Sequence, residues 1–258
     1  MSDAYFERTG AGRFRATEHT SGAWDTTAQH VAPALGLLVH AIEVDRDARR
    51  NDALLTARIS ADILGTMPLG EVDVSVEVLR PGRTIELVQA TMSAGGRAAV
   101  TLRAWLLESR ATGTIAASAL PRIAGPEDVP AWDPTTVWPG GFIASVDVRR
   151  RQIEPGRASF WARTALPVVA DEAVSPTARA AGLLDISNGM TVRVDPRRVA
   201  FPNVDLTAHL LRAPAGDWLG FDTTVSFGPQ GLGVTSSVLH DATGPVGTSS
   251  QVLTVRPG

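Results

Sequence analysis

The sequence lacks cysteine and lysine throughout its 258 residues. The absence of cysteine excludes disulfide frameworks, zinc fingers, iron–sulfur sites and thiol nucleophiles. Arginine supplies all 24 basic residues, so Schiff-base enzymes, pyridoxal-phosphate enzymes and Walker-type ATPases, which need a lysine, are excluded. The chain also lacks a large net charge of either sign, because its net charge is only −3. The composition therefore predicts neither nucleic acid nor an anionic membrane surface as a partner.

Long apolar runs and metal-binding patterns are also missing. The longest apolar stretches, such as 32–42, are shorter than the ~20 residues that span a bilayer, and the acidic N-terminus has no signal-peptide core. The histidines share no metal-ligand spacing, and no Gly-x-Ser-x-Gly motif marks an α/β-hydrolase. We therefore expect a cytoplasmic protein without membrane insertion, metal or cofactor.

A proline-rich stretch divides the chain into two halves. Five prolines lie between residues 108 and 142, among Gly, Ser, Thr and Ala. Proline removes a backbone donor and fixes φ, so this pattern predicts an irregular connection over 111–142. It separates an N-terminal unit, 1–110, from a C-terminal unit, 143–258. Hydrophobic residues at 44% and charged residues at 20% are typical of globular domains.

The first half reads as one helix followed by strands. Apolar residues at helical spacing predict a helix over 29–42, with a cap among residues 25–27. Strict alternation of valine with polar residues predicts a strand over 71–78. Turn residues then predict two further strands of a meander, at 84–92 and 98–107.

The second half repeats this order. Ser175 and Pro176 predict the start of a second helix, and Asn188-Gly189 predicts a left-handed end to it. Four strands are predicted to follow, near 203–211, 218–227, 233–240 and 246–255, with a hairpin loop at 241–244 joining the last two.

Weak sequence similarity between the halves supports a duplication. Gly96–Arg103 superposes on Gly244–Gln251, and residues 78–81 match 210–213, which would make Asp73 the counterpart of Asp205. The predicted fold class is α+β, with two antiparallel sheets that each pack on one long helix.

Short motifs over nearly the whole chain resemble the acyl-CoA thioesterase II-like family, in its broad thioesterase-like superfamily form. The resemblance is carried by 22–25, 29–33, 79–83, 204–209, 217–219 and the C-terminal pattern from Leu239 to Arg256. It implies a double hotdog fold, each half being one hotdog. It also implies hydrolysis of an acyl-CoA, or a similar acyl thioester, to a free acid and a thiol.

The resemblance further implies a set of catalytic residues. Members of the family orient the attacking water with an aspartate, a hydroxyl and a glutamine of the second hotdog. These roles map onto Asp205, Ser226 and Gln251, with Thr224 as the second choice for the hydroxyl. A thioester is already an activated acyl group, so one positioned water suffices for hydrolysis.

Substrate binding is expected at the start of the first helix, where backbone N–H groups would hold the thioester carbonyl. The residues implied are His30, Val31 and Ala32, together with Trp218. The family usually has a Gly-Gly pair where this chain has Val31 and Ala32. Their side chains are expected to narrow the acyl entrance or to remove the oxyanion donors.

Two other functions are also compatible with the sequence. The Val31-Ala32 pair favours a non-catalytic module that binds acyl-CoA or lipid. Asp205 and His209, four residues apart, allow a hydratase, although the Asn-Pro typical of hotdog hydratases is missing between them. The arginines at 149–151 and 197–198 are candidates for coenzyme A phosphates, or are solvated strand ends. A homo-oligomer is compatible with either function.

Overall fold

The computed structural model describes residues 3–52 and 54–258. In the first half the strands are β1 (Phe6–Gly10), β2 (Arg13–Ala16), β3 (Leu54–Ile63), β4 (Gly70–Arg80), β5 (Ile85–Ala94) and β6 (Arg97–Glu108). In the second half they are β7 (Ala131–Trp132), β8 (Val146–Glu154), β9 (Arg157–Thr164), β11 (Asp205–Leu210), β12 (Leu219–Phe227), β13 (Leu232–Asp241) and β14 (Gly244–Thr254). Two short strands, β10 (Val199–Ala200) and β15 (Arg256–Pro257), pair with each other.

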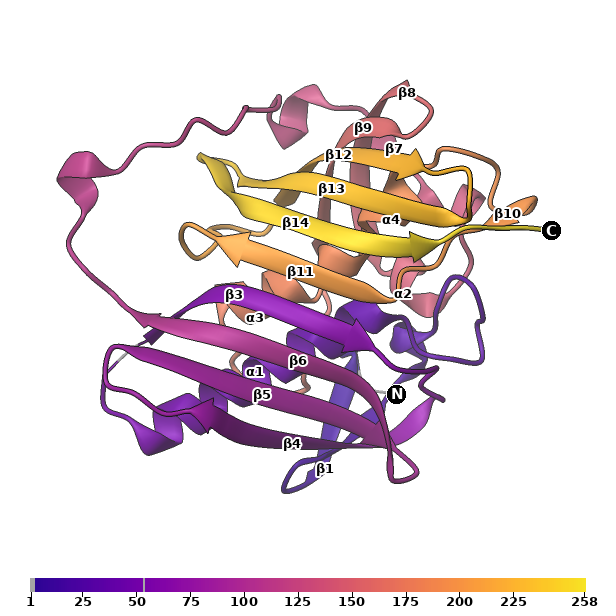
Figure 1. The fold of residues 1–258 in the computed structure, drawn as a ribbon. Coiled ribbons are helices and arrows are strands. Elements are labelled where there is room, and N and C mark those ends of the chain that lie inside the picture. Colours follow the sequence, from indigo (N-terminus) through magenta and orange to yellow (C-terminus); the bar gives the residue numbers. More distant parts are fainter. Residues whose placement is uncertain (1–2, 53) are drawn as a thin grey trace.

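The predicted division into two sheets is wrong, because one continuous antiparallel sheet of 13 strands crosses both halves (Figure 1). Its order is β1-β2-β4-β5-β6-β3-β11-β14-β13-β12-β9-β8-β7. β3 pairs with β11, with Ser60 opposite Thr207, and so joins the two halves. This pairing satisfies backbone groups that two separate sheets would leave along exposed edges.

The strand order supports the predicted duplication and corrects one of its alignments. The order β4-β5-β6-β3 is mirrored by β11-β14-β13-β12, so β3 corresponds to β11 and β6 to β14. Gly96, which directly precedes β6, and Gly244, which begins β14, are therefore equivalent. The match of 78–81 to 210–213 is wrong, because it places β4 on β11, and Asp73 is not the counterpart of Asp205.

The first predicted helix is confirmed as α1 (Val31–Arg49), which starts later and runs longer than expected. Its cap is His30, whose Nδ1 accepts a hydrogen bond from the Ala32 N–H at 3.1 Å, and not one of residues 25–27. Leu35, Leu38 and Ile42 are fully buried, because α1 packs against β5 and β6. The sheet and this helix form the two layers of the first half.

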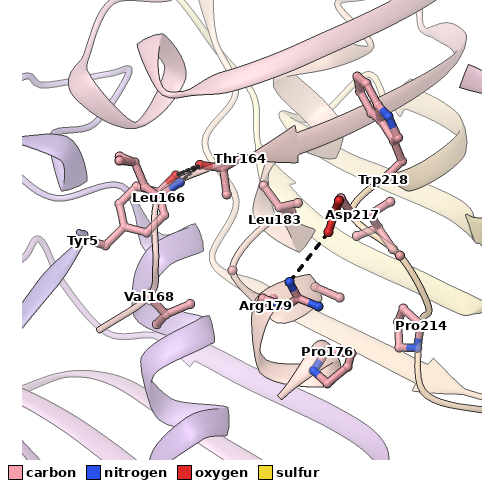
Figure 2. A pocket seen from close by; sticks show the side chains of 14 residues that line it. Tyr5, Thr164, Leu166, Val168, Pro176, Arg179, Leu183, Pro214, Asp217 and Trp218 are labelled. Atoms are coloured by element: carbon pink, nitrogen blue, oxygen red, sulfur yellow. Dashed lines mark hydrogen bonds and ion pairs between the residues drawn. The ribbon is translucent and has the colours of Figure 1, made fainter. Parts of the chain in front are cut away.

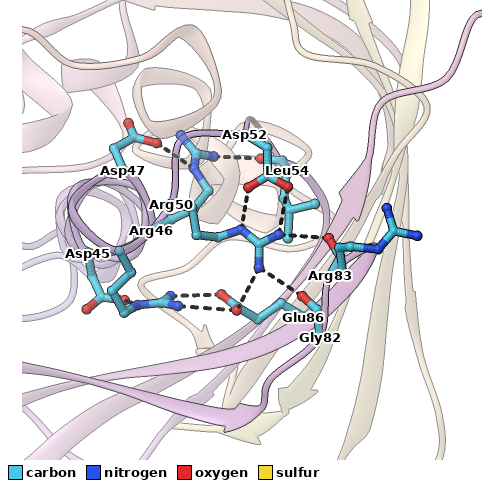
Figure 3. A network of polar contacts seen from close by, with 10 residues as sticks. Asp45, Arg46, Asp47, Arg50, Asp52, Leu54, Gly82, Arg83 and Glu86 are labelled. Carbon is cyan, nitrogen blue, oxygen red and sulfur yellow. Dashed lines mark hydrogen bonds and ion pairs between the residues drawn. The ribbon is translucent and has the colours of Figure 1, made fainter.

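Charged side chains fasten the end of α1 to the sheet (Figure 3). Glu86 on β5 is 1% exposed and accepts hydrogen bonds from Arg49 at 2.8 Å and Arg50 at 3.4 Å. Arg50 also donates to the carbonyls of Gly82 and Arg83, in the turn between β4 and β5. The helix C-terminus, the turn and β5 are thereby held together.

The predicted second long helix is wrong. The chain forms α3 (Pro176–Ala181), a 3₁₀ turn at Leu184–Ile186 and α4 (Ser187–Met190), in addition to α2 (Gly141–Ala144) earlier in the half. Ser175 caps α3 as predicted, since its hydroxyl accepts from the Ala178 N–H at 3.0 Å. Asn188 and Gly189 lie inside α4 and Gly189 is not left-handed. α3 ends with Gly182 as its C-cap, and the backbone is again non-helical at Asp185 (φ −82°, ψ 17°), whose side chain is buried and hydrogen-bonded.

The remaining predictions hold in outline. The strands predicted near 71–78, 84–92 and 98–107, and the four in the second half, are present as β4–β6 and β11–β14 with shifted ends. β1, β2, β3, β7, β8, β9 and the short strands β10 and β15 were not predicted. From residue 111 to 130 the predicted connection contains 3₁₀ turns and no strand, and it packs on the second half through hydrogen bonds from Trp161 to Ala124 and between His240 and Pro121. β7 also lies inside the predicted range 111–142 but joins the sheet. Within residues 3–52 and 54–258, no helix is long and apolar enough to cross a membrane.

Candidate functional site

A buried carboxyl group, that of Asp185, lies where three segments of the second half meet. Its Oδ1 accepts hydrogen bonds from Nδ2 of Asn203 at 2.5 Å and from Nε2 of Gln251 at 2.9 Å. Asp185 stands at the interruption between α3 and α4, Asn203 precedes β11, and Gln251 lies on β14. Asp185 is 5% exposed and Gln251 2%. Two amide donors thus fix one carboxyl oxygen and leave the other, Oδ2, available.

Burial dominates the electrostatics of this cluster. It raises the pKa of Asp185 to about 7, against the hydrogen bonds from Asn203 and Gln251, and the charge of Asp205 adds to the rise. Burial also lowers the pKa of His30 to about 3, so its imidazole is neutral near pH 7. Nδ1 of His30 lies 3.9 Å from Oδ2 of Asp185, too far for a hydrogen bond. Asp185 can therefore exchange a proton near neutral pH, whereas His30 cannot.

The cluster opens into a cavity that both halves line. Its volume is about 560 Å³, within the range of small-molecule sites. The first half contributes Trp24, His30 and Val31 to its wall, and the second half contributes Asp185, Asn203 and Arg256. The Trp24 ring contacts the rings of Trp138 and Phe201 at centroid distances of 4.8 and 5.3 Å. The cavity wall thus carries the Trp24 ring, the Asp185 carboxyl beside the Asn203 amide, and an arginine, whereas Gln251 contacts Asp185 without lining the cavity.

Of the predicted catalytic residues, the structure brings only Gln251 to Asp185. Asp205 begins β11, and its Oδ1 accepts from the Val252 N–H at 2.6 Å. Ser226 and Thr224 are exposed on β12, where the alternate residues, such as Val225, are buried. Gln251 points to the buried face of the same sheet. The structure therefore does not place Ser226 or Thr224 beside Gln251.

Only some of the residues predicted to bind substrate lie at the cavity. His30 and Val31 line the cavity, but Ala32 is fully buried and its N–H is bound to His30. Trp218 lies in a different pocket, of about 50 Å³, whose wall includes Leu183 and the Arg179–Asp217 ion pair of 3.7 Å (Figure 2). The structure gives Trp218 no contact with the cavity of Asp185.

The other polar patterns lie away from this cavity or are already paired. His209 is exposed on β11 and does not line it. Arg149 donates to backbone carbonyls of Pro126 and Val129, and Arg197 pairs with Asp195. Within the described ranges, no group of three or more His, Asp or Glu side chains could hold a metal ion.

Asp185 and Asn203 were not identified from the sequence. One signal was present: Asp185 is a single carboxylate with an apolar residue on either side, Leu184 and Ile186. A carboxylate is almost never buried unless paired, so its place there indicated a partner. Asn203 carried no such signal, because its direction depends on the backbone just before β11.

Comparisons with known proteins agree with this architecture. Residues 20–107 match the family model of the acyl-CoA thioesterase N-terminal domain, and residues 126–255 match that of the acyl-CoA thioesterase C-terminal domain. A comparison with curated protein sequences gives no match.

Solved structures share the fold at low sequence identity. A conserved protein of unknown function with hot dog fold from Alicyclobacillus acidocaldarius has a TM-score of 0.77 and 15% identity, over 100% of this chain and 97% of that chain. The acyl-CoA thioesterase II TesB2 of Mycobacterium marinum has a TM-score of 0.69 and 15% identity, over 98% and 96%. The tesB protein of Mycobacterium avium subs paratuberculosis has a TM-score of 0.63 and 19% identity, over 98% and 96%. The fold is thus the hotdog fold, and the chain belongs to the acyl-CoA thioesterase family.

Proposed function

We propose that the protein hydrolyses an acyl-CoA, or a closely related acyl thioester, with a water bound at Asp185, Asn203 and Gln251. The observation that carries this proposal is the buried Asp185 carboxyl, held by two amide donors at the wall of a cavity large enough for a substrate. This set replaces Asp205 and Ser226 of the sequence prediction and keeps Gln251.

The chemistry needs one base and no covalent intermediate. Oδ2 of Asp185 accepts a proton from the water while the water oxygen attacks the thioester carbonyl carbon. The tetrahedral adduct then collapses, the C–S bond breaks, and the proton passes from Asp185 to the leaving sulfur. A pKa of about 7 for Asp185 suits both steps, because the group can take up and release a proton at neutral pH.

An unused acceptor supports a bound water at this place. Oε1 of Gln251 is buried and has no partner among the described residues. An unsatisfied buried polar atom costs about 1–3 kcal/mol, and an ordered water often removes that cost. A water that donates to Gln251 and Asp185 would be held with its lone pairs free for attack.

In this proposal the start of α1 binds the carbonyl oxygen of the thioester. Val31 is its first residue and lines the cavity, and first-turn N–H groups of a helix have no intrahelical partner. The positive end of the helix dipole favours the negative charge that develops on that oxygen. The Val31 N–H is therefore the proposed oxyanion donor.

Arg256 supports coenzyme A as the carrier. It is exposed and lines the same cavity, so its guanidinium is available to the phosphates of the nucleotide. We expect the pantetheine arm to run from Arg256 toward Asp185.

A second candidate, binding without hydrolysis, is favoured by one observation. The Ala32 N–H, which could serve as an oxyanion donor, is occupied by His30. The Val31 and His30 side chains also stand at the cavity wall. A protein that binds acyl-CoA but cannot stabilise the oxyanion would result.

Thiol release from acyl-CoAs of different chain length separates the two candidates. A thiol-reactive dye reads the product without background, because the protein has no cysteine. Hydrolysis that is lost in Asp185→Asn and Gln251→Ala, and kept in the matched control Ser226→Ala, would support the proposed site. If the wild-type protein binds acyl-CoA but hydrolyses none of the substrates, the second candidate is established. Loss of turnover in Ser226→Ala would contradict the residue assignment.

A further inference from the structure

The strand β11 contains an extra residue next to the candidate site. Thr207 pairs with Ser250 on β14, whereas Asn203 bridges Leu253. From Asn203 to Thr207 the chain advances four residues, and on β14 it advances only three over the same distance. This mismatch is a β-bulge, which bends a strand and redirects the side chains on one side of it.

The bulge explains the direction of Asn203. Leu206 and Ala208 are buried on the inner face of β11, so unbroken alternation would turn Asn203 to the outer face together with Thr207. The extra residue reverses this, and Nδ2 of Asn203 reaches Asp185 on the inner face.

Asp205 makes the contacts that hold the bulge. Its Oδ1 accepts from the Val252 N–H at 2.6 Å, where a regular ladder would use a backbone carbonyl. Its own carbonyl accepts from Nδ2 of Asn203 at 3.0 Å. Val252 directly follows Gln251. Asp205 therefore contacts the backbone next to Gln251 and also the side chain of Asn203.

We propose that Asp205 is a positioning residue, which closes the bulge and thereby aims Asn203 and Gln251 at Asp185. Its carboxylate acts as a hydrogen-bond acceptor for the backbone and not as a base. This inference rests on the proposed function only for its effect on turnover. The geometric part, the orientation of Asn203, stands without it.

The test compares Asp205→Ala with Asp205→Asn, because the asparagine keeps an Oδ1 acceptor for Val252 and loses the charge. Displaced positioning groups typically cost about 10- to 100-fold in activity. We expect kcat for acyl-CoA hydrolysis to fall by about that factor in Asp205→Ala, with KM changed less than about twofold. Asp205→Asn should stay within about threefold of wild type. Asp62→Ala is the matched control, since Asp62 is the exposed cross-strand neighbour of Asp205 and should change neither constant.

A second readout follows Asn203 itself. In ¹⁵N-labelled protein, its side-chain amide signals should be slowly exchanging in wild type, Asp205→Asn and Asp62→Ala, and shifted and faster to exchange in Asp205→Ala. Asp205→Asn as inactive as Asp205→Ala would overturn the positioning role in favour of a base. Unchanged Asn203 signals in Asp205→Ala would overturn it as well.

Two further outcomes are also decisive. If Asp205→Ala fails to fold by circular dichroism, Asp205→Asn decides, because near-normal turnover supports positioning and loss of turnover contradicts it. If wild type hydrolyses no thioester, the proposed function fails, and the Asn203 signals in the two variants alone decide the positioning role.

Discussion

Replacing Asp185 by asparagine should lower activity and raise stability at the same time. The substitution keeps the shape of the side chain and an Oδ1 acceptor for Asn203 and Gln251, but it removes the proton acceptor. Loss of a general base typically costs 10²–10⁴-fold in rate, so we expect kcat to fall by about 10³-fold. Substrate binding should persist, because the cavity wall is unchanged.

The gain in stability follows from the pKa of Asp185. Its folded pKa, about 7 instead of the ordinary 3.8, is raised, so the protonated form is favoured in the folded state. Its stabilising contribution is complete below pH 4 and is lost as the pH rises through 7. A pKa difference of one unit corresponds to about 1.4 kcal/mol, so ionisation of the buried carboxylate lowers the free energy of unfolding by up to about 4 kcal/mol at pH 8 and above.

Denaturant unfolding of wild type and Asp185→Asn at pH 4 and pH 8 measures this difference. The asparagine variant should gain stability over wild type at pH 8 and lose most of that gain at pH 4. Wild-type kcat/KM should rise about tenfold for each pH unit below 7 and level off above it. Full activity in Asp185→Asn, or an equal stability difference at both pH values, would refute the assignment of Asp185 as a buried base.

Three further predictions concern other parts of the structure. Gln251→Ala should reduce kcat by about 10–100-fold with little change in KM, because the amide orients Asp185 and water; unchanged kcat in stopped-flow thiol release would count against it. Arg256→Ala should raise KM for acyl-CoA about tenfold. It should leave KM unchanged for the matching acyl-pantetheine, because that substrate has no nucleotide phosphates. Equal effects on both substrates would contradict a role of Arg256 in binding the carrier. Glu86→Gln should lower the free energy of unfolding by about 2 kcal/mol at pH 7. The Arg49 hydrogen bond lowers the pKa of Glu86, so its stabilising effect is present above its ordinary pKa and is lost as the pH falls through the lowered value. A penalty for Glu86→Gln that is the same at pH 3 as at pH 7 would contradict this.

Local patterns were sufficient to predict many of the elements. The alternation in β4, the turn glycines before β6 and the Ser175 cap of α3 depend on interactions between residues close in the chain. These were found where they were expected. The β1–β2 hairpin and β8–β9 were missed, since their alternation is interrupted by charged residues such as Arg149 and Arg150.

Long-range contacts decided what local patterns could not. A long second helix was a reasonable prediction for residues 176–189, but α3 ends with Gly182 as its C-cap, and the helix does not resume through Asp185, which is non-helical and buried against Asn203 and Gln251. The cost of burying a carboxyl without partners exceeds the helix propensity of a few residues. The partners lie 18 and 66 residues away along the chain, so no local pattern could reveal the cluster.

The sequence by itself determined the family, the strands that became β4–β6 and β11–β14, and the absence of thiol and lysine chemistry. Each of these follows from residue identity or from neighbours along the chain. The tertiary structure decided that the two sheets are one, because only the assembled chain shows the β3–β11 pairing. It also decided the candidate site, because a one-residue bulge beside Asp205 determines whether Asn203 faces solvent or Asp185. Side chains alternate between the faces of a strand, so a single inserted residue reverses the direction of those beyond it.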